Sequence, residues 1–278
     1  MIARNFYYVI DDAVEEFRDD DFHKPMWTVA INVRRTGTVD LAQEFSVAMF
    51  GDDHRISMFK IRVPAFDEAS PEKDLEVVQT IKETMIAVLH FTYDHKAEIH
   101  TVHFAADEEE DKTYSVALQM RAVRNEQFQV QYENIRSSFV NAWPIRYDLK
   151  LLSYGTQDSL PLEFRYLSLY KLLELNFKAK GKWNSQYDDL LATFTDDYAA
   201  LKVSKLQFKN YVEHLRDRCA HIKSKRDEVP MGITMLNNKD ATEVNSVIPI
   251  MIAMCTSVIN NHKENNGLQL LPRPQTRA

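Results

Sequence analysis

Glycine and cysteine are both scarce in this sequence, and each scarcity excludes a class of site. Only six of the 278 residues are glycine, and the phosphate-binding patterns G-x-x-x-x-G-K-[ST] and G-x-G-x-x-G and the nucleophile pattern G-x-S-x-G do not occur. The two cysteines, Cys219 and Cys255, lie on apolar helical faces with no further metal ligands at a recognisable spacing. We therefore expect buried thiols, no metal site, no disulfide and no cofactor.

Long apolar runs are also missing. The longest, Val247 to Cys255, is far shorter than the ~20 residues that a helix needs to span a bilayer. Asp11 and Asp12 interrupt the N-terminal segment where a signal peptide would need an apolar core. The sequence therefore predicts a soluble, cytoplasmic protein with no membrane partner.

Residues 1–154 form an acidic region with the pattern of a mixed domain of strands and helix. They carry 17 basic and 27 acidic side chains. Short segments rich in β-branched and aromatic residues predict strands at 26–34, 44–50, 56–63, 99–105, 113–121 and 128–132. Ser70 and Pro71 predict the start of a helix that runs to about Phe91 and buries Leu75, Val78, Ile81, Ile86 and Leu89. We expect this domain to sense a ligand, bind a regulatory protein or restrain the rest of the chain.

Residues 155–264 predict a bundle of four or five helices, and 265–278 a tail without periodicity. The turn residues at 153–159 mark the expected boundary at 154/155. Helices are expected from Leu162 to a terminating Gly181, over 184–200, over 202–226, and from a capping box at 240–243 onward. Pro249 is expected either to kink this last helix or to mark its true start. The predicted class is therefore α+β, a mixed domain followed by an all-α bundle.

The helix over 202–226 is the most distinctive stretch. Val212, Leu215, Cys219 and Ile222 fall in one narrow arc at helical spacing, which predicts a face packed on a core. The stretch contains eight Lys or Arg against two acidic residues, in a chain whose net charge is −7. Such a local excess of positive charge is typical of a surface that binds polyanions.

One short motif in this stretch carries a resemblance. Arg216, the polar Asp217 after it, three more residues and then His221 are similar to the R-x4-6-H signature of the HEPN superfamily. HEPN domains are helical bundles, and many are metal-independent ribonucleases that act as homodimers in prokaryotic defence, including antiviral systems and toxins. The resemblance covers about residues 160–265 and implies RNA as the substrate. Lys223 stands where HEPN toxins controlled by nucleotide transfer often have Tyr, so we do not expect that form of control.

The resemblance assigns roles to individual residues. It implies proton transfer by His221 and a phosphate clamp by Arg216, with Asp217 completing the catalytic motif. Glu174 and Arg165 on the first bundle helix are expected to support the site. The cations expected to steer the RNA strand are Arg218, Lys205, Lys209, Lys223 and Lys225.

These residue types suit RNA cleavage by the neighbouring 2′-hydroxyl. Histidine exchanges a proton near neutral pH, and the guanidinium of arginine matches a phosphate. Five positions along a straight helix turn a side chain by about 140°, so Arg216 and His221 of one chain do not face the same phosphate unless the helix ends or bends. A two-fold axis near the motif also solves this, and we expect a homodimer through the C-terminal bundle.

A second interpretation requires no chemistry. Arg216 then pairs with Asp217 or Glu213 on a solvated helix face, and His221 interacts with the helix dipole at a helix end. The bundle is in that case an inactive dimerisation or docking module.

Overall fold

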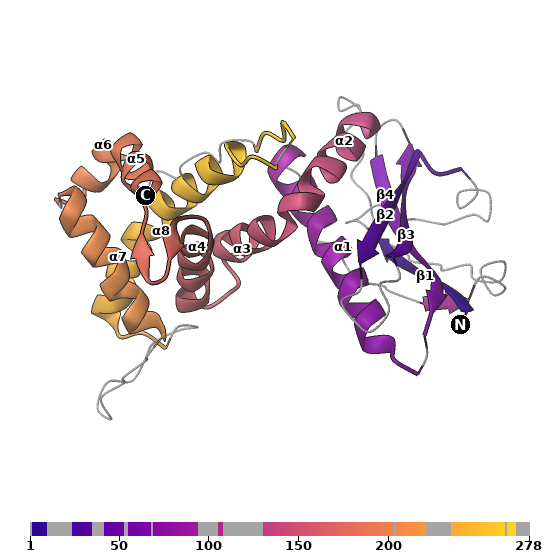
Figure 1. Cartoon of the computed structure of the whole chain (residues 1–278), viewed down its shortest axis with the longest axis horizontal. Coiled ribbons are helices and arrows are strands. Elements are labelled where there is room, and N and C mark those ends of the chain that lie inside the picture. The colour runs from indigo at the N-terminus through magenta and orange to yellow at the C-terminus, as the bar shows by residue number, and fades with distance from the viewer. Residues whose placement is uncertain are drawn as a thin grey trace. The chain divides into compact units, whose positions relative to one another are not determined.

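The computed structural model describes residues 2–9, 24–34, 42–52, 55–67, 69–93, 105–107, 130–202, 204–220, 235–264 and 266–270 (Figure 1). The chain divides into two compact units, Met1–Trp143 and Pro144–Ala278. The α+β class predicted from the sequence is confirmed.

The first unit is built on an antiparallel sheet. Its strands are β1 (Ile2–Val9), β2 (Trp27–Arg34), β3 (Ala42–Asp52), β4 (Arg55–Phe66) and β5 (Ala105–Asp107), in the order β2-β3-β4-β1-β5. The strands predicted at 26–34, 44–50 and 56–63 are confirmed as β2, β3 and β4. Residues 99–104 and the predicted strand at 113–121 lie outside the described residues. The sequence did not predict β1, which pairs with both β4 and β5.

Two helices pack on this sheet. The first, α1 (Pro71–Tyr93), begins at Pro71 as predicted and contacts β4, while α2 (Tyr132–Ala142) contacts β2 and α1 (Figure 1). Val78, Ile81 and Leu89 are buried as predicted, but Leu75 is 45% exposed. The strand predicted at 128–132 is wrong at Tyr132, which is the first residue of α2.

The second unit is a set of helices with one short hairpin. Its elements are η2 (Trp143–Ile145), α3 (Arg146–Thr156), α4 (Leu162–Phe177), β6 (Lys178–Ala179), β7 (Lys182–Trp183), α5 (Ser185–Thr193), α6 (Thr195–Ala199), α7 (Lys205–Ala220) and α8 (Asn238–Asn260). The units divide before α3, whereas the boundary was expected at 154/155. The turn residues there end α3, which packs on α4 and α8 and so belongs to the helical unit.

The core of this unit lies around α4, which contacts α3, α7 and α8 (Figure 1). Tyr166, Leu169 and Leu173 of α4 are fully buried, as their spacing predicts. The Tyr166 hydroxyl donates a 2.6 Å hydrogen bond to the carbonyl oxygen of Val212 on α7. Because a buried hydroxyl without a partner is costly, this bond helps to fix α7 against α4.

The long helix α8 has the strongest apolar character. Within the described part of the chain it is the one helix that is long and apolar enough to cross a membrane, and half of its most apolar stretch is buried in the structure, as in a core helix. Pro249 lies inside α8 without ending it. The cap is Asn237, whose side chain accepts a 2.9 Å hydrogen bond from the Asp240 amide, so the capping box expected to open at Asp240 is wrong.

Two local expectations about turns and the tail need correction. Gly181 does not end α4, which stops at Phe177. Lys180 (φ +51°) and Gly181 (φ +77°) instead form the two-residue turn between β6 and β7, where a type I′ turn requires both φ values to be positive. In the expected tail, Leu268 and Leu270 are buried.

The two cysteines are buried thiols, as predicted. Burial raises the pKa of Cys219 to about 12 and the pKa of Cys255 well above its ordinary value.

Candidate functional site

Arg216 lies on α7 beside α4. The apolar side of α7 is buried at Val212, Leu215 and Cys219, which leaves Arg216 at the edge with 39% of its side chain exposed. Its Nη1 donates a 2.7 Å hydrogen bond to Asp217 Oδ1, and its Cζ lies 5.8 Å from the centre of the Tyr170 ring. The hydrogen bond to Asp217 raises the pKa of Arg216, and the charges of neighbouring groups add to this effect.

The other half of the motif, His221, lies outside the described residues, as do Lys223 and Lys225. The structure therefore shows the surroundings of Arg216 and Asp217 alone.

A polar group of side chains from α4, β6 and α7 surrounds the Tyr170 ring. We call Tyr170, Glu174, Lys178, Glu213 and Arg216 the Tyr170 cluster. Lys178 Nζ donates to the Tyr170 hydroxyl at 3.1 Å and to Glu213 Oε1 at 3.1 Å, and it lies 3.8 Å from Glu174 Oε1. Burial opposes the charge of Lys178, but the hydrogen bonds to Tyr170 and Glu213 raise its pKa on balance.

Glu174, which the resemblance names as a possible supporting residue, lies near enough to Arg216 for their charges to interact. A hydrogen bond from Lys171 lowers the pKa of Glu174, and the positive charges of Lys178 and Arg216 lower it further. Glu213, one of the two expected partners of Arg216, binds Lys178 instead. The sequence did not identify Tyr170 or Lys178, because the hairpin that carries Lys178 was not predicted.

Three of the other cations expected at the site are engaged within the protein. Lys209 Nζ lies 3.0 Å and Lys205 Nζ 4.0 Å from Asp188 Oδ1 on α5. Arg165 pairs with Asp158 at 2.9 Å, which ties α4 to the turn after α3. Arg165 and Glu174, the two residues expected to support the site, are thus separated. Arg165 lies at the α3–α4 connection, and Glu174 lies in the Tyr170 cluster.

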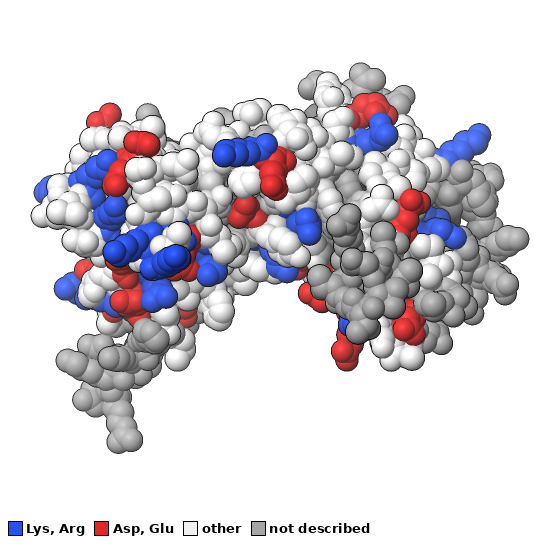
Figure 2. Space-filling model, in the orientation of Figure 1, with Lys and Arg blue, Asp and Glu red and all other residues white. Residues whose placement is uncertain are grey.

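Arg218 faces α8 and not α4. Its Nη1 binds Asp240 Oδ1 and lies 3.2 Å from Glu243 Oε2. Among the described residues of this stretch, the charges of Lys205, Lys209 and Arg218 are therefore offset in space by carboxylates from α5 and α8. Figure 2 shows the result on one face, where acidic and basic side chains alternate over the helical unit.

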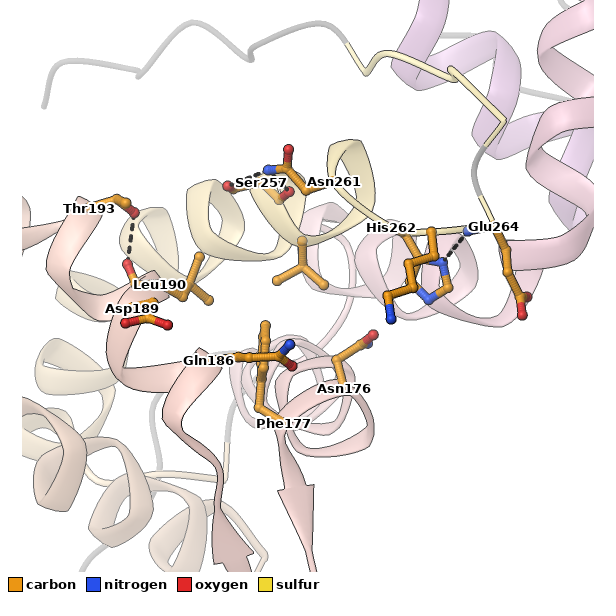
Figure 3. Close-up of a pocket in the computed structure, with 12 residues that line it drawn as sticks. Asn176, Phe177, Gln186, Asp189, Leu190, Thr193, Ser257, Asn261, His262 and Glu264 are labelled. Carbon is orange, nitrogen blue, oxygen red and sulfur yellow. Dashed lines mark hydrogen bonds between the residues drawn. The ribbon is translucent and has the colours of Figure 1, made fainter.

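A separate hollow of about 540 Å³ lies between the end of α4, α5 and the end of α8 (Figure 3). Its polar lining includes the amides of Asn176, Gln186 and Asn261, the hydroxyls of Thr193 and Ser257, and His262. His262 Nδ1 accepts a 3.2 Å hydrogen bond from the Glu264 amide, and Nε2 lies 3.8 Å from Asp148 Oδ2. Burial raises the pKa of Asp148.

Nδ1 of His262 is thus engaged by a backbone amide, and Nε2 lies near the Asp148 carboxylate. No local pattern in the sequence indicates this hollow, because its lining comes from three separate helices. Among the residues that the structure describes, no group of three or more His, Cys, Asp or Glu side chains could hold a metal ion.

The structure thus places Arg216, one of several partly exposed cations of the predicted site, against an aromatic ring and near the carboxylates of Asp217 and Glu174. Such an arrangement can hold a guanidinium in a fixed position facing solvent, where it can donate hydrogen bonds to a phosphate. Comparisons with known proteins give no further assignment: no protein-family model, no curated protein and no solved structure matches this chain.

Proposed function

We propose that this protein is a metal-independent endoribonuclease that cleaves RNA through Arg216 and His221. The proposal follows from the resemblance of the motif to the HEPN signature. The observation that supports it is the position of Arg216, which is held by the Tyr170 ring and Asp217 and remains 39% exposed. A cation that is already oriented loses little side-chain freedom when a phosphate binds.

The chemistry needs one proton-transfer group and one positive charge. His221 takes the proton from the RNA 2′-hydroxyl, whose oxygen attacks the adjacent phosphorus, and the bond from phosphorus to the 5′-oxygen breaks. Arg216 stabilises the negative charge that gathers on the phosphoryl oxygens. A proton then returns to the leaving 5′-oxygen. The products are a 2′,3′-cyclic phosphate and a 5′-hydroxyl, and no metal takes part in any step.

The experiment is cleavage of labelled single-stranded RNA in excess EDTA, with the ends of the products identified. Arg216→Ala and His221→Ala should each reduce the rate by at least 100-fold, the order expected when a proton-transfer group or a charge-stabilising group is lost. Matched controls are His214→Ala, an exposed histidine on the same helix, and Arg136→Ala, an exposed arginine of α2. The proposal fails if EDTA abolishes cleavage or if the control variants lose as much activity as the site variants.

We further propose that the active form is a homodimer through the helical unit, with both chains contributing to one groove. This follows from the angle of about 140° between positions five apart on a straight helix. Mixing and re-annealing the two inactive variants tests it, because a heterodimer of Arg216→Ala with His221→Ala retains one Arg216 and one His221. Recovery of activity supports a shared groove, and its absence despite heterodimer formation contradicts one.

In this proposal, the first unit (Met1–Trp143) controls the nuclease by binding a regulatory protein or ligand, as in a defence or stress system. Toxicity of the full chain on expression, relieved by Arg216→Ala or His221→Ala, is the expected cellular sign. Unrelieved toxicity argues against nuclease activity as its cause.

One observation favours the second interpretation, an inactive dimerisation or docking module. Lys205, Lys209 and Arg218 all pair with carboxylates of the same unit, which leaves less positive charge for an RNA strand. A stable dimer that never cleaves RNA, with any partner or ligand tried, supports this alternative.

A further inference from the structure

The hairpin β6–β7 carries a concentration of lysine that the predicted site did not include. Three of the six residues from Lys178 to Trp183 are lysine, and none is acidic. Lys178 points inward to the Tyr170 cluster with 15% of its side chain exposed, whereas Lys180 and Lys182 are exposed. Figure 2 shows basic side chains on this face of the helical unit, with acidic ones between them.

The turn itself is unusual for a lysine. Lys180 has φ +51° and stands at the first position of the two-residue turn, where Asn, Asp or Gly is favoured because the left-handed region suits short side chains. A long cationic side chain at this position is not explained by local stability. Residues held in unfavourable backbone conformations cluster at functional sites.

Lys180 and Lys182 also differ from the other cations near the site. Lys205, Lys209 and Arg218 each pair with a carboxylate from another helix. For Lys180 and Lys182, no carboxylate partner occurs among the residues that the structure describes. Within this described part of the chain, no carboxylate thus offsets their charge.

The hairpin is fixed to α7 next to Arg216. The Trp183 ring stacks on Tyr187 with centroids 4.2 Å apart, and its Nε1 donates a 2.8 Å hydrogen bond to Glu213 Oε1. Glu213 precedes Arg216 by three positions, so the two residues are neighbours on one side of α7. Lys178 and Arg216 both contact the Tyr170 ring, at 5.7 and 5.8 Å from its centre. The exposed lysines thus sit on a rigid support that joins them to Arg216.

We propose that the β6–β7 hairpin is an RNA-binding element, in which Lys180 and Lys182 contact backbone phosphates of a single strand that reaches Arg216. This inference rests on the proposed ribonuclease function and adds where the substrate strand lies. The contacts are to phosphates, so they contribute affinity and orientation and do not read sequence.

The test measures binding without cleavage. Binding of a fluorescein-labelled single-stranded RNA to the full-length His221→Ala protein is followed by anisotropy in EDTA at several salt concentrations. The test variant is Lys180→Asn/Lys182→Gln. Because Asn is favoured at the turn position of Lys180, this change removes two charges while it keeps or improves the turn. The control, Lys73→Ala/Lys239→Ala, removes two charges from other exposed lysines.

Each phosphate contact to a single strand contributes about 0.7 to the salt dependence of log K. Loss of two contacts should therefore reduce the slope by about 1.4, which corresponds to a roughly 25-fold weaker affinity at about 0.1 M salt if the difference vanishes near 1 M. The control should change neither quantity to this extent.

Equal effects of the two double variants, an unchanged slope in the hairpin variant, or no RNA binding by the His221→Ala protein would each overturn the inference. The melting temperature reports whether the variant remains folded, and Lys180→Gly/Lys182→Thr repeats the test if the first variant loses structure. Because binding is measured in a protein that cannot use His221, the result does not depend on whether the wild-type protein cleaves RNA. If RNA binding depends on the hairpin but the wild-type protein does not cleave RNA, the proposed nuclease activity is contradicted and the RNA-binding role of the hairpin is not.

Discussion

The two arginines of the motif should differ in what their loss costs. Arg218 binds Asp240 and Glu243 on α8, and the three side chains are only 32%, 17% and 26% exposed. A hydrogen bond to a charged group contributes ~1.5–3 kcal/mol when shielded, and an exposed ion pair ~0.2–1 kcal/mol. At this intermediate exposure we expect Arg218→Ala to lower the free energy of unfolding by about 1–2 kcal/mol, because it also removes the guanidinium between Asp240 and Glu243, two like charges three positions apart on α8.

Arg216 is in the opposite situation. Among the residues that the structure describes, it forms an ion pair with the adjacent Asp217, which is 63% exposed. Pairs of this kind contribute about 0–1 kcal/mol. Arg216→Ala should therefore lower the free energy of unfolding by well under 1 kcal/mol while it removes the proposed RNA cleavage. Arg218→Ala should lower the stability, and it should reduce activity only to the extent that the helical unit becomes less ordered.

Urea unfolding followed by circular dichroism gives the free energies, with Arg136→Ala as the control for loss of an exposed arginine. Because the chain has two compact units, hydrogen exchange of peptides from α7 and α8 is needed to assign the change to the helical unit. If Arg216→Ala destabilises the protein as much as Arg218→Ala, Arg216 is a structural residue and the assignment of its role is wrong.

Three further predictions concern the frame of the helical unit. Gly155→Ala places a methyl group against the Leu169 side chain where α3 meets α4, and should lower the melting temperature through an overpacking cost of ~1–3 kcal/mol that Leu169→Ala partly relieves in the double variant. Asn237→Ala removes the cap of α8 and should cost ~1 kcal/mol in urea unfolding. Burial raises the pKa of Asp148, so its ionised form disfavours the folded state and this penalty is lost as the pH falls through the raised pKa. Asp148→Asn should thus stabilise the protein more at pH 7 than near pH 3.5, and a pH-independent difference would contradict this.

Periodicity was sufficient to predict β2, β3, β4, α1 and the main helices. β1 was missed for a physical reason. Asn5, Phe6, Tyr7 and Tyr8 are all buried, because β1 is a central strand between β4 and β5. A strand buried on both faces has no alternation of polar and apolar residues to detect.

The hairpin β6–β7 could not be predicted from its own residues. Each strand has two residues, too few for a periodic signal, and Gly181 after a helical pattern is equally consistent with a helix cap. What fixes the hairpin is the bond from Trp183 to Glu213, thirty residues later in the chain.

A count of charges along the sequence also misses ion pairs that form between separate helices. The excess over residues 202–226 is real in the sequence, but Asp188 lies beside Lys209, and Asp240 lies beside Arg218. Each of these pairs joins separate helices, so a local count does not include both partners. The motif depends on local spacing, which is why Arg216 could be proposed from the sequence, whereas Glu174 was proposed only from the resemblance to HEPN domains.

The burial of both native thiols has a practical consequence for labelling. Since Cys219 and Cys255 are enclosed and remain protonated at neutral pH, they should react slowly with maleimides. Lys182→Cys would introduce an exposed sulfhydryl on β7, so a dye could be attached to the hairpin without removing either natural cysteine. Because this change also removes one of the two lysines proposed to contact RNA, fluorescence from that single probe would report on the conformation of the hairpin itself.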